Sequence, residues 1–154
     1  MYLKAGQILD MLREIELIMA ELYRRFSHIF VQDRVFWEDL SRDEESHAGM
    51  VTELKNTLLR NGSPFEVGKM NLFALSTYRQ GIKSQLSRLQ RGELERQNAL
   101  FIARDFEKTL IEHSFYESIQ SKNPEYRAIR DKIRKETEFH LQKLENYIKT
   151  LFPF

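Results

Sequence analysis

Hydrophobic residues recur every three or four positions along most of the chain, which is the spacing of one face of an α-helix. The pattern divides into four long segments of similar length, and we predict helices over residues 3–30, 33–60, 93–120 and 124–151. Charged residues occupy the remaining faces of each segment, as expected for helices that pack together through one side.

Turn signals separate the predicted helices. Asp33 follows a short break and is predicted to cap the second helix. Asn123, followed by Pro124, is predicted to cap the fourth helix, because proline suits the first helical position. The run Asn61-Gly62-Ser63-Pro64 is a strong stop signal after the second helix. Each pair of helices is therefore expected to form an antiparallel hairpin.

Residues 65–92 form a long connection between the two hairpins, residues 3–60 and 93–151. The apolar residues of this connection are also helically spaced, so we predict a helix over about residues 69–90, kinked at Gly81. The predicted fold is all-α, a four-helix bundle of two antiparallel hairpins joined by a long helical crossover. The length of 154 residues suits one domain with a sizeable core.

Composition agrees with a helical globular protein, since 42% of residues are hydrophobic, 31% are charged, and only 6 are glycine and 3 proline. The net charge of +1 argues against nucleic acid as a partner. No apolar run approaches the roughly 18 residues of a membrane span, so no membrane partner is expected. The absence of cysteine excludes disulfides, iron–sulfur clusters and cysteine-based zinc sites, and favours a cytoplasmic location.

Three polar residues interrupt the apolar stripes of the first hairpin. Glu16 lies within the stripe of the first helix, and Glu44 and His47 continue the stripe of the second. Residues three apart lie one turn apart on the same helix face, so Glu44 and His47 can hold one cation between them. A single pair of this kind also arises by chance, and further residues are needed to support a metal site.

An internal repeat supplies those residues. The two hairpins align without a gap at an offset of 93, which places Tyr23 on Tyr116 and His47 on His140. Duplicated hairpins form a bundle with a pseudo-twofold axis, in which equivalent inner residues face each other. His47 and His140 are therefore predicted to lie on opposite walls of one central site, next to Glu16. Carboxylate and imidazole together suit iron, manganese or zinc.

With these motifs the chain resembles the ferritin-like, rubrerythrin-type di-iron carboxylate family, and the resemblance covers nearly the whole chain. The motifs that carry it are Glu16 to Tyr23, Phe36 to His47, Ala103 to Glu107, Phe115-Tyr116 and Glu136 to His140. The family has one glutamate on each of two helices and Glu-x-x-His on each of the other two. The resemblance implies that Glu16, Glu44, His47 and His140 are metal ligands. It also implies an iron centre in an oxidoreductase that acts on oxygen or peroxide.

Two positions depart from the family pattern. The repeat places Thr109 where a glutamate is expected, seven residues before the second tyrosine, and Thr137 where one is expected three residues before His140. With only Glu16 and Glu44 as carboxylates, two divalent cations would leave about two positive charges uncompensated in a low-dielectric core. We therefore expect one ion rather than two.

Other residues of the second half are candidates to replace the missing carboxylates. His113 and Glu112 lie four and three residues after Thr109, and Glu136 lies four residues before the second histidine of the repeat. Each also has an ordinary interpretation, as a hydrogen-bonded core histidine or a surface carboxylate. Glu107, two residues before Thr109, is expected to face water or a neighbouring helix.

The sequence leaves alternative functions open. The first is a metal-binding protein, with redox chemistry that would need an external electron donor because no cysteine segment is present. The second is a degenerate, metal-free family member that acts as a structural or partner-binding helical module, with a homodimer as the assembly considered. Costly buried charges have been kept, which favours the metal. An iron-storage cage ranks last, because residues 65–92 look helical and not extended.

Overall fold

The computed structural model describes residues 2–61, 65–68 and 72–153 of the chain, and these residues are mostly helical, as the hydrophobic pattern predicts. The described part contains five α-helices: α1 (Tyr2–Ile29), α2 (Arg34–Asn61), α3 (Leu72–Gln90), α4 (Arg96–Glu112) and α5 (Pro124–Leu151). Two short strands, β1 (Phe65–Val67) and β2 (Ile119–Ser121), and two 3₁₀ turns, Val31–Asp33 and Phe115–Ser118, complete it.

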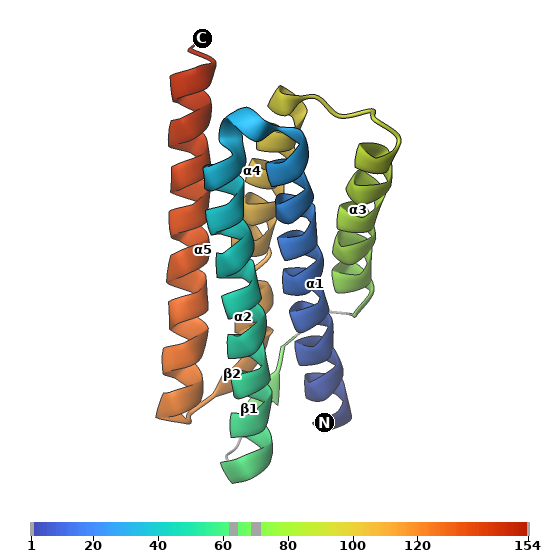
Figure 1. Ribbon diagram of the computed structural model, residues 1–154. Helices are drawn as coiled ribbons and strands as arrows, with labels where there is room; N and C mark the ends of the chain where they lie inside the picture. Colours follow the sequence, from blue (N-terminus) through green and yellow to red (C-terminus); the bar gives the residue numbers. More distant parts are fainter. Residues whose placement is uncertain (1, 62–64, 69–71, 154) are drawn as a thin grey trace.

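The long helices lie side by side and alternate in direction (Figure 1). α1 packs antiparallel against α2, and α4 packs antiparallel against α5 (Figure 1). α2 contacts α5 between the hairpins, while α3 runs beside part of α1 (Figure 1). The apolar inner faces of α1, α2, α4 and α5 meet in the interior of the molecule.

The predicted apolar stripe of α1 forms the centre of the core. Ile8, Leu12, Ile15 and Met19 are each at most 1% exposed. A fully buried side chain of this kind stabilises the fold by about 1.5–3 kcal/mol relative to an exposed one. Glu16 lies among these residues and is just as buried. A carboxylate in such surroundings requires polar partners, because burial of an unpaired charge is strongly unfavourable.

The start of α5 agrees with the sequence prediction. The Asn123 side-chain oxygen accepts the backbone N–H groups of Glu125 and Tyr126 at 2.8 and 3.2 Å, and Pro124 occupies the first helical turn. α2 ends at Asn61, and the remainder of the predicted stop signal, residues 62–64, lies outside the described residues. The expected start of the crossover helix, residues 69–71, also lies outside them. α3 continues through Gly81 without a break.

The prediction for the third helix was wrong beyond residue 112. α4 ends at Glu112, Ser114 adopts a left-handed conformation (φ 50°), and the chain continues through the 3₁₀ turn Phe115–Ser118 into β2. β2 pairs antiparallel with β1, which the sequence did not predict. The Gly68 N–H donates to the Ser118 carbonyl oxygen at 2.6 Å, and a Cβ at residue 68 would lie only 3.3 Å from that oxygen. Glycine therefore permits this close approach of the crossover to the second hairpin.

Asp33 does not cap α2, contrary to the prediction. It lies in the 3₁₀ turn, and its buried carboxylate accepts two hydrogen bonds from Arg96 at 2.7 Å and one from Tyr147 at 2.5 Å. Burial raises the pKa of Asp33, but the hydrogen bonds from Arg96 and Tyr147 outweigh burial and hold the pKa below its ordinary value. This ion pair joins the turn of the first hairpin to the start of α4 and the end of α5.

No helix in the described part of the chain is both long enough and apolar enough to cross a membrane.

We expect Arg96→Ala to lower the free energy of unfolding by about 2–3 kcal/mol, because it leaves the carboxylate of Asp33 buried without its cation. This is less than for a fully buried pair, since the Arg96 side chain is 33% exposed. Urea denaturation measures the change. Arg34→Ala is the matched control, because Arg34 pairs with Glu38 at 3.7 Å on the surface, and it should cost less than about 0.5 kcal/mol. Equal losses in the two variants would contradict the prediction.

Candidate metal centre

Five buried polar side chains from four helices lie close together in the interior. Glu16 comes from α1, Glu44 and His47 from α2, Glu107 from α4 and His140 from α5. All five are at most 2% exposed. We call these residues the central cluster. Each lies on the inner face of its helix, so the packing of the apolar stripes is what brings them together.

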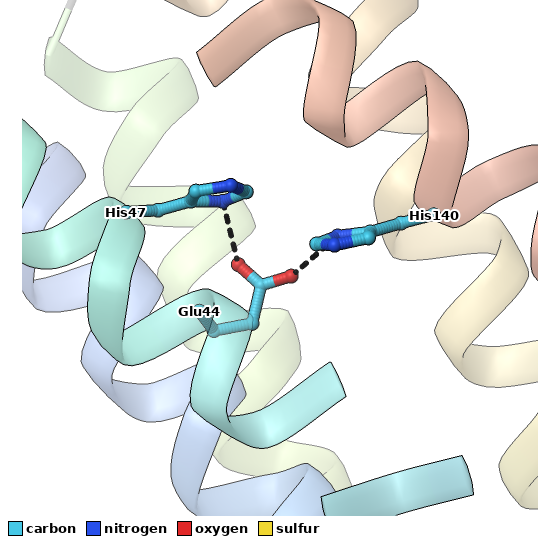
Figure 2. Close-up of side chains that lie close together, drawn as sticks. All are labelled: Glu44, His47 and His140. Atoms are coloured by element: carbon cyan, nitrogen blue, oxygen red, sulfur yellow. Dashed lines mark hydrogen bonds and ion pairs between the residues drawn. The ribbon is translucent and has the colours of Figure 1, made fainter. Parts of the chain in front are cut away.

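Glu44 lies between the two imidazole rings (Figure 2). Its Oε1 is 3.1 Å from Nδ1 of His140, and its Oε2 is 3.5 Å from Nδ1 of His47. The rings of His47 and His140 are stacked, with centroids 5.3 Å apart and an interplanar angle of 25°. One ligand atom from each of these three residues lies within 4.8 Å of the others. The prediction that the two histidines face each other across one site is confirmed.

The other two glutamates flank this group symmetrically. Glu16 Oε2 is 3.8 Å from Nδ1 of His47, and Glu107 Oε1 is 3.8 Å from Nδ1 of His140. Each Nδ1 atom therefore faces Glu44 and one flanking glutamate. The three carboxylates and two imidazoles form two half-sites that share Glu44.

Two tyrosines hold the flanking glutamates, and each comes from the opposite hairpin. The Tyr23 hydroxyl donates to Glu107 Oε1 at 3.0 Å, and the Tyr116 hydroxyl donates to Glu16 Oε1 at 2.5 Å. Burial raises the pKa of both phenols, and the adjacent glutamates raise it further, so both remain protonated donors. The repeated tyrosines thus orient the carboxylates of the other half.

The outer nitrogens of the histidines face two further carboxylates, also from opposite hairpins. Nε2 of His140 is 3.0 Å from Asp43 Oδ2, and Nε2 of His47 is 3.8 Å from Glu136 Oε2. Asp43 and Glu136 are equivalent at the offset of 93, and their side chains are 49% and 38% exposed. A carboxylate on the outer nitrogen fixes the ring orientation and directs Nδ1 into the centre.

The cluster has unusual electrostatics. Burial raises the pKa of Glu44 well above its ordinary value, and the charges of Glu107 and Glu16 raise it further. Burial lowers the pKa of both histidines, but contacts with Glu16 and Glu44 at His47, and with Glu107 and Glu44 at His140, outweigh it and raise the pKa to about 11. Without a metal, both imidazoles therefore carry a proton at neutral pH, and the network of opposite charges is held together by ion pairing.

Several atoms at the centre lack a hydrogen-bond partner among the described residues. Buried polar groups are nearly always hydrogen-bonded, and an exception calls for an explanation such as a bound ion. The unpartnered atoms in the central cluster are Glu16 Oε2, Glu44 Oε2, Glu107 Oε2 and both ring nitrogens of His47. The contacts of Glu16 Oε2, Glu44 Oε2 and Glu136 Oε2 with the ring nitrogens of His47 are 3.5–3.8 Å long, longer than ordinary hydrogen bonds. Carboxylate oxygens and imidazole nitrogens so arranged fit the ligands of a divalent transition metal.

The structure corrects the sequence interpretation of α4. Glu112 and His113 are exposed, with Glu112 near Lys108 and His113 stacked on Phe115, so neither joins the central cluster. Thr109 is not at the centre either, since its hydroxyl donates to the Asp105 carbonyl oxygen of its own helix. The structure does bring Glu136 to the edge of the cluster, beside His47.

Glu107 is the residue that the sequence interpretation placed wrongly. It was expected to face water or a neighbouring helix, but it is 0% exposed and lies at the centre. The gapless repeat assumed seven residues from carboxylate to tyrosine, as between Glu16 and Tyr23. In the second half the interval is nine residues, because the helix ends before Tyr116.

A signal for Glu107 was nevertheless present in the sequence. Leu100, Ala103, Glu107 and Leu110 follow one another at intervals of three and four residues, which is the spacing of one inner helix face. All four are buried. The helical period of α4 taken alone predicts Glu107 as an inner residue, whereas the alignment of the two halves does not.

Comparison of the chain with protein-family models, with curated proteins and with solved structures found no match.

In the chelator-treated protein we expect the free energy of unfolding to fall as the pH rises from about 7 to 10. The raised histidine pKa values stabilise the folded state fully below the unfolded value of 6.5, and this contribution is lost as the pH approaches 11. The slope is at most about 1.4 kcal/mol per pH unit for each histidine. Urea denaturation at several pH values measures it.

His140→Gln should reduce this slope, because it removes one of the two titrating groups. His113→Gln is the matched control, since His113 is exposed, and it should keep the slope of the unchanged protein. If His140→Gln kept the same slope as the control, the imidazole would not be charged in the folded state.

Proposed function

We propose that the central cluster is a non-haem metal centre that binds two divalent ions, iron or manganese, in a ferritin-like four-helix bundle. The observation that carries the proposal is the convergence around Glu44 of buried carboxylate and imidazole atoms that have no hydrogen-bond partner in the described part of the chain. Three glutamates lie buried at one place in the core, and a bound cation would pair with their carboxylates.

The pairwise arrangement supports two ions. One ion would be held by Glu16 and His47, the other by Glu107 and His140, and Glu44 offers one oxygen to each. Carboxylates that bridge two cations are a feature of two-metal sites. Each flanking glutamate also has a tyrosine that holds it in place, as expected for ligands that must keep a fixed position.

Glu107 changes the charge argument that favoured one ion. From the sequence alone, Glu16 and Glu44 were the expected carboxylates, and Thr109 was expected at the centre. With Glu107 as a third carboxylate, two divalent cations leave about one positive charge uncompensated, which nearby Asp43 and Glu136 reduce further. The main objection to a second ion is thereby removed.

The helix arrangement supports the ferritin-like interpretation. Two antiparallel hairpins, α1–α2 and α4–α5, are joined by the crossover that contains α3, and ligands on all four long helices project inward. This arrangement is used by di-iron and di-manganese carboxylate proteins. A bound metal pair of this kind supplies electrons and open coordination positions for the reduction of oxygen or peroxide. Since the chain has no cysteine, electrons would come from an external donor.

One observation favours the alternative, a metal-free module. Both ring nitrogens of His140 lie within hydrogen-bond distance of carboxylate oxygens, Nδ1 of Glu44 and Nε2 of Asp43. A protonated His140 is thus satisfied without a metal. His47 is not, because its nearest carboxylate oxygens are 3.5–3.8 Å away. Because His47 lacks the close contacts that His140 has, the two histidines together still favour a bound metal over the metal-free alternative.

Metal uptake tests the proposal directly. We expect chelator-treated protein, titrated without oxygen with Fe(II) or Mn(II), to bind about two ions per chain and to release protons from the histidines. Isothermal titration calorimetry and elemental analysis measure affinity and stoichiometry. No uptake of either metal would overturn the proposal, and a stoichiometry of about one would contradict the sharing of Glu44.

Matched variants on α4 and among the histidines test the ligand assignment. Glu107→Gln and His140→Gln should weaken binding of at least one ion by ~10-fold or more, since each removes a ligand. Glu112→Gln and His113→Gln should bind as the unchanged protein does, because both side chains are exposed. Equal effects of Glu107→Gln and Glu112→Gln would contradict the assignment of Glu107.

Redox chemistry is tested separately from binding. We expect the Fe(II)-loaded protein to develop ferric near-ultraviolet absorbance after addition of hydrogen peroxide or oxygen, faster than Fe(II) alone in the same buffer. Protein filled first with Zn(II), which is not redox-active, is the control. If bound iron oxidised no faster than free iron, the protein would bind metal without promoting its oxidation.

A further inference from the structure

A surface cavity lies where the start of α5 meets the two short strands. Its volume is about 400 Å³, within the range of small-molecule sites in proteins. The polar residues that line it are Glu66, Gln120, Ser121, Lys122, Arg127 and Arg130. Arg130 precedes His140 by ten residues on α5, which is about 15 Å along the helix, so the cavity is separate from the central cluster and does not depend on a metal there.

Positive charge gathers at this cavity. Lys122, Arg127 and Arg130 line it, together with a single carboxylate, that of Glu66. Among the described residues, the ion pairs close to the start of α5 involve Arg60, Arg130 and Arg134, and neither Lys122 nor Arg127 takes part in one. Residues 62–64 and 69–71 contain no Asp or Glu, so they add no carboxylate. The cations of the cavity are therefore largely uncompensated.

Arg130 is the buried cation of the cavity, with 9% of its surface exposed. Its Nε and Nη2 donate to Asp131 Oδ1 at 3.3 and 3.1 Å, and its Nη1 donates to Gln120 Oε1 at 3.5 Å. The Asp131 side chain is 41% exposed, and the contact with Gln120 is at the limit of hydrogen-bond distance. A guanidinium has more N–H donors than these contacts use, and a buried donor without an acceptor is unfavourable. A ligand with several acceptor oxygens would satisfy them.

Ser121 adds a neutral donor to the lining. It is 8% exposed, and its Oγ accepts the Asn123 N–H at 3.1 Å, while its own proton has no acceptor among the described residues. The N–H groups of Glu125 and Tyr126, in the first turn of α5, are already bound by the Asn123 side chain. Side chains, and not the N-terminus of the helix, therefore supply the donors of the cavity.

We propose that this cavity binds a phosphate group, either free or carried by a small organic molecule. Arginine and lysine are the side chains that recognise phosphate, whose several acceptor oxygens match a guanidinium fork. The excess of cations over carboxylates in the lining favours a dianion over a monoanion.

The remaining space favours a phosphate carried by an organic group. The cavity is larger than a phosphate group requires, and the half-buried Phe65 also lines it, so an apolar or aromatic group attached to the phosphate can pack there. A nucleic-acid chain is disfavoured, because the net charge of the protein is only +1 and the cations are confined to one small cavity.

A nuclear magnetic resonance titration of the whole chelator-treated chain tests the proposal, since removal of metal prevents phosphate from binding to it. The probes are phenyl phosphate, inorganic phosphate and benzoate at constant ionic strength. We expect saturable shifts of the backbone amides of residues 119–130, with benzoate bound at least ~10-fold more weakly than phenyl phosphate. Phenyl phosphate should bind ~5-fold more tightly than inorganic phosphate, because its ring is also buried. Equal affinities of the two would identify free phosphate as the ligand and support the same site.

Charge variants test which residues hold the phosphate. Lys122→Gln and Arg127→Gln should each weaken phenyl phosphate binding by ~10-fold or more, because each removes a charge-assisted hydrogen bond. Lys132→Gln is the matched control, since it removes the same charge from an exposed position of α5 outside the lining, and it should weaken binding less than ~2-fold. Glu66→Gln should strengthen binding by ~3-fold or more, a gain that a folding defect cannot produce.

Three results would overturn the proposal. The first is the absence of saturable shifts at residues 119–130 with either phosphate probe. The second is an equal loss of affinity in Arg127→Gln and Lys132→Gln. The third is benzoate binding as tight as that of phenyl phosphate, which would show that the cavity does not select a phosphate group.

Discussion

Burial of the Glu44 carboxylate between two imidazoles is the interaction on which the rest of the centre depends. A carboxylate with no access to water requires opposite charge or hydrogen-bond donors close by, because burial of an unpaired charge costs several kcal/mol. Here His47 and His140 supply them from opposite sides, and each histidine needs its own carboxylates, Glu16 and Glu107. The pKa shifts follow from the same arrangement, since burial and mutual charge raise the pKa of Glu44 and the carboxylates raise those of the histidines.

Buried polar groups of each hairpin form hydrogen bonds with residues of the other hairpin. Tyr23 of the first hairpin holds Glu107 of the second, Tyr116 of the second holds Glu16 of the first, and Asp43 holds the outer nitrogen of His140. Neither hairpin alone satisfies its buried polar groups, so formation of the centre and packing of the two hairpins are coupled. The ion pair of Asp33 with Arg96 makes the same kind of link at one end of the molecule.

The departure from symmetry at Thr137 distinguishes the two faces of the centre. Glu44 places a carboxyl group between the two histidines, whereas the equivalent position on α5, Thr137, carries a hydroxyl that donates to the Ile133 carbonyl oxygen. The central cluster therefore has three buried carboxyl groups, Glu16, Glu44 and Glu107, and their pattern is not the same in the two hairpins.

The sequence by itself determined most of the helical segments and four members of the central cluster, Glu16, Glu44, His47 and His140. Apolar periodicity is a local property, and one turn of helix places Glu44 beside His47, so the repeat was enough to bring His140 opposite them. Only the tertiary structure decided the rest. The end of α4 at Glu112, the left-handed Ser114 and the β1–β2 pairing change the interval between carboxylate and tyrosine from seven to nine residues, and this moved Glu107 to the centre in place of Thr109. The physical reason is that spacing predicts position only within an unbroken helix, whereas the path of the chain after a break depends on contacts with distant residues.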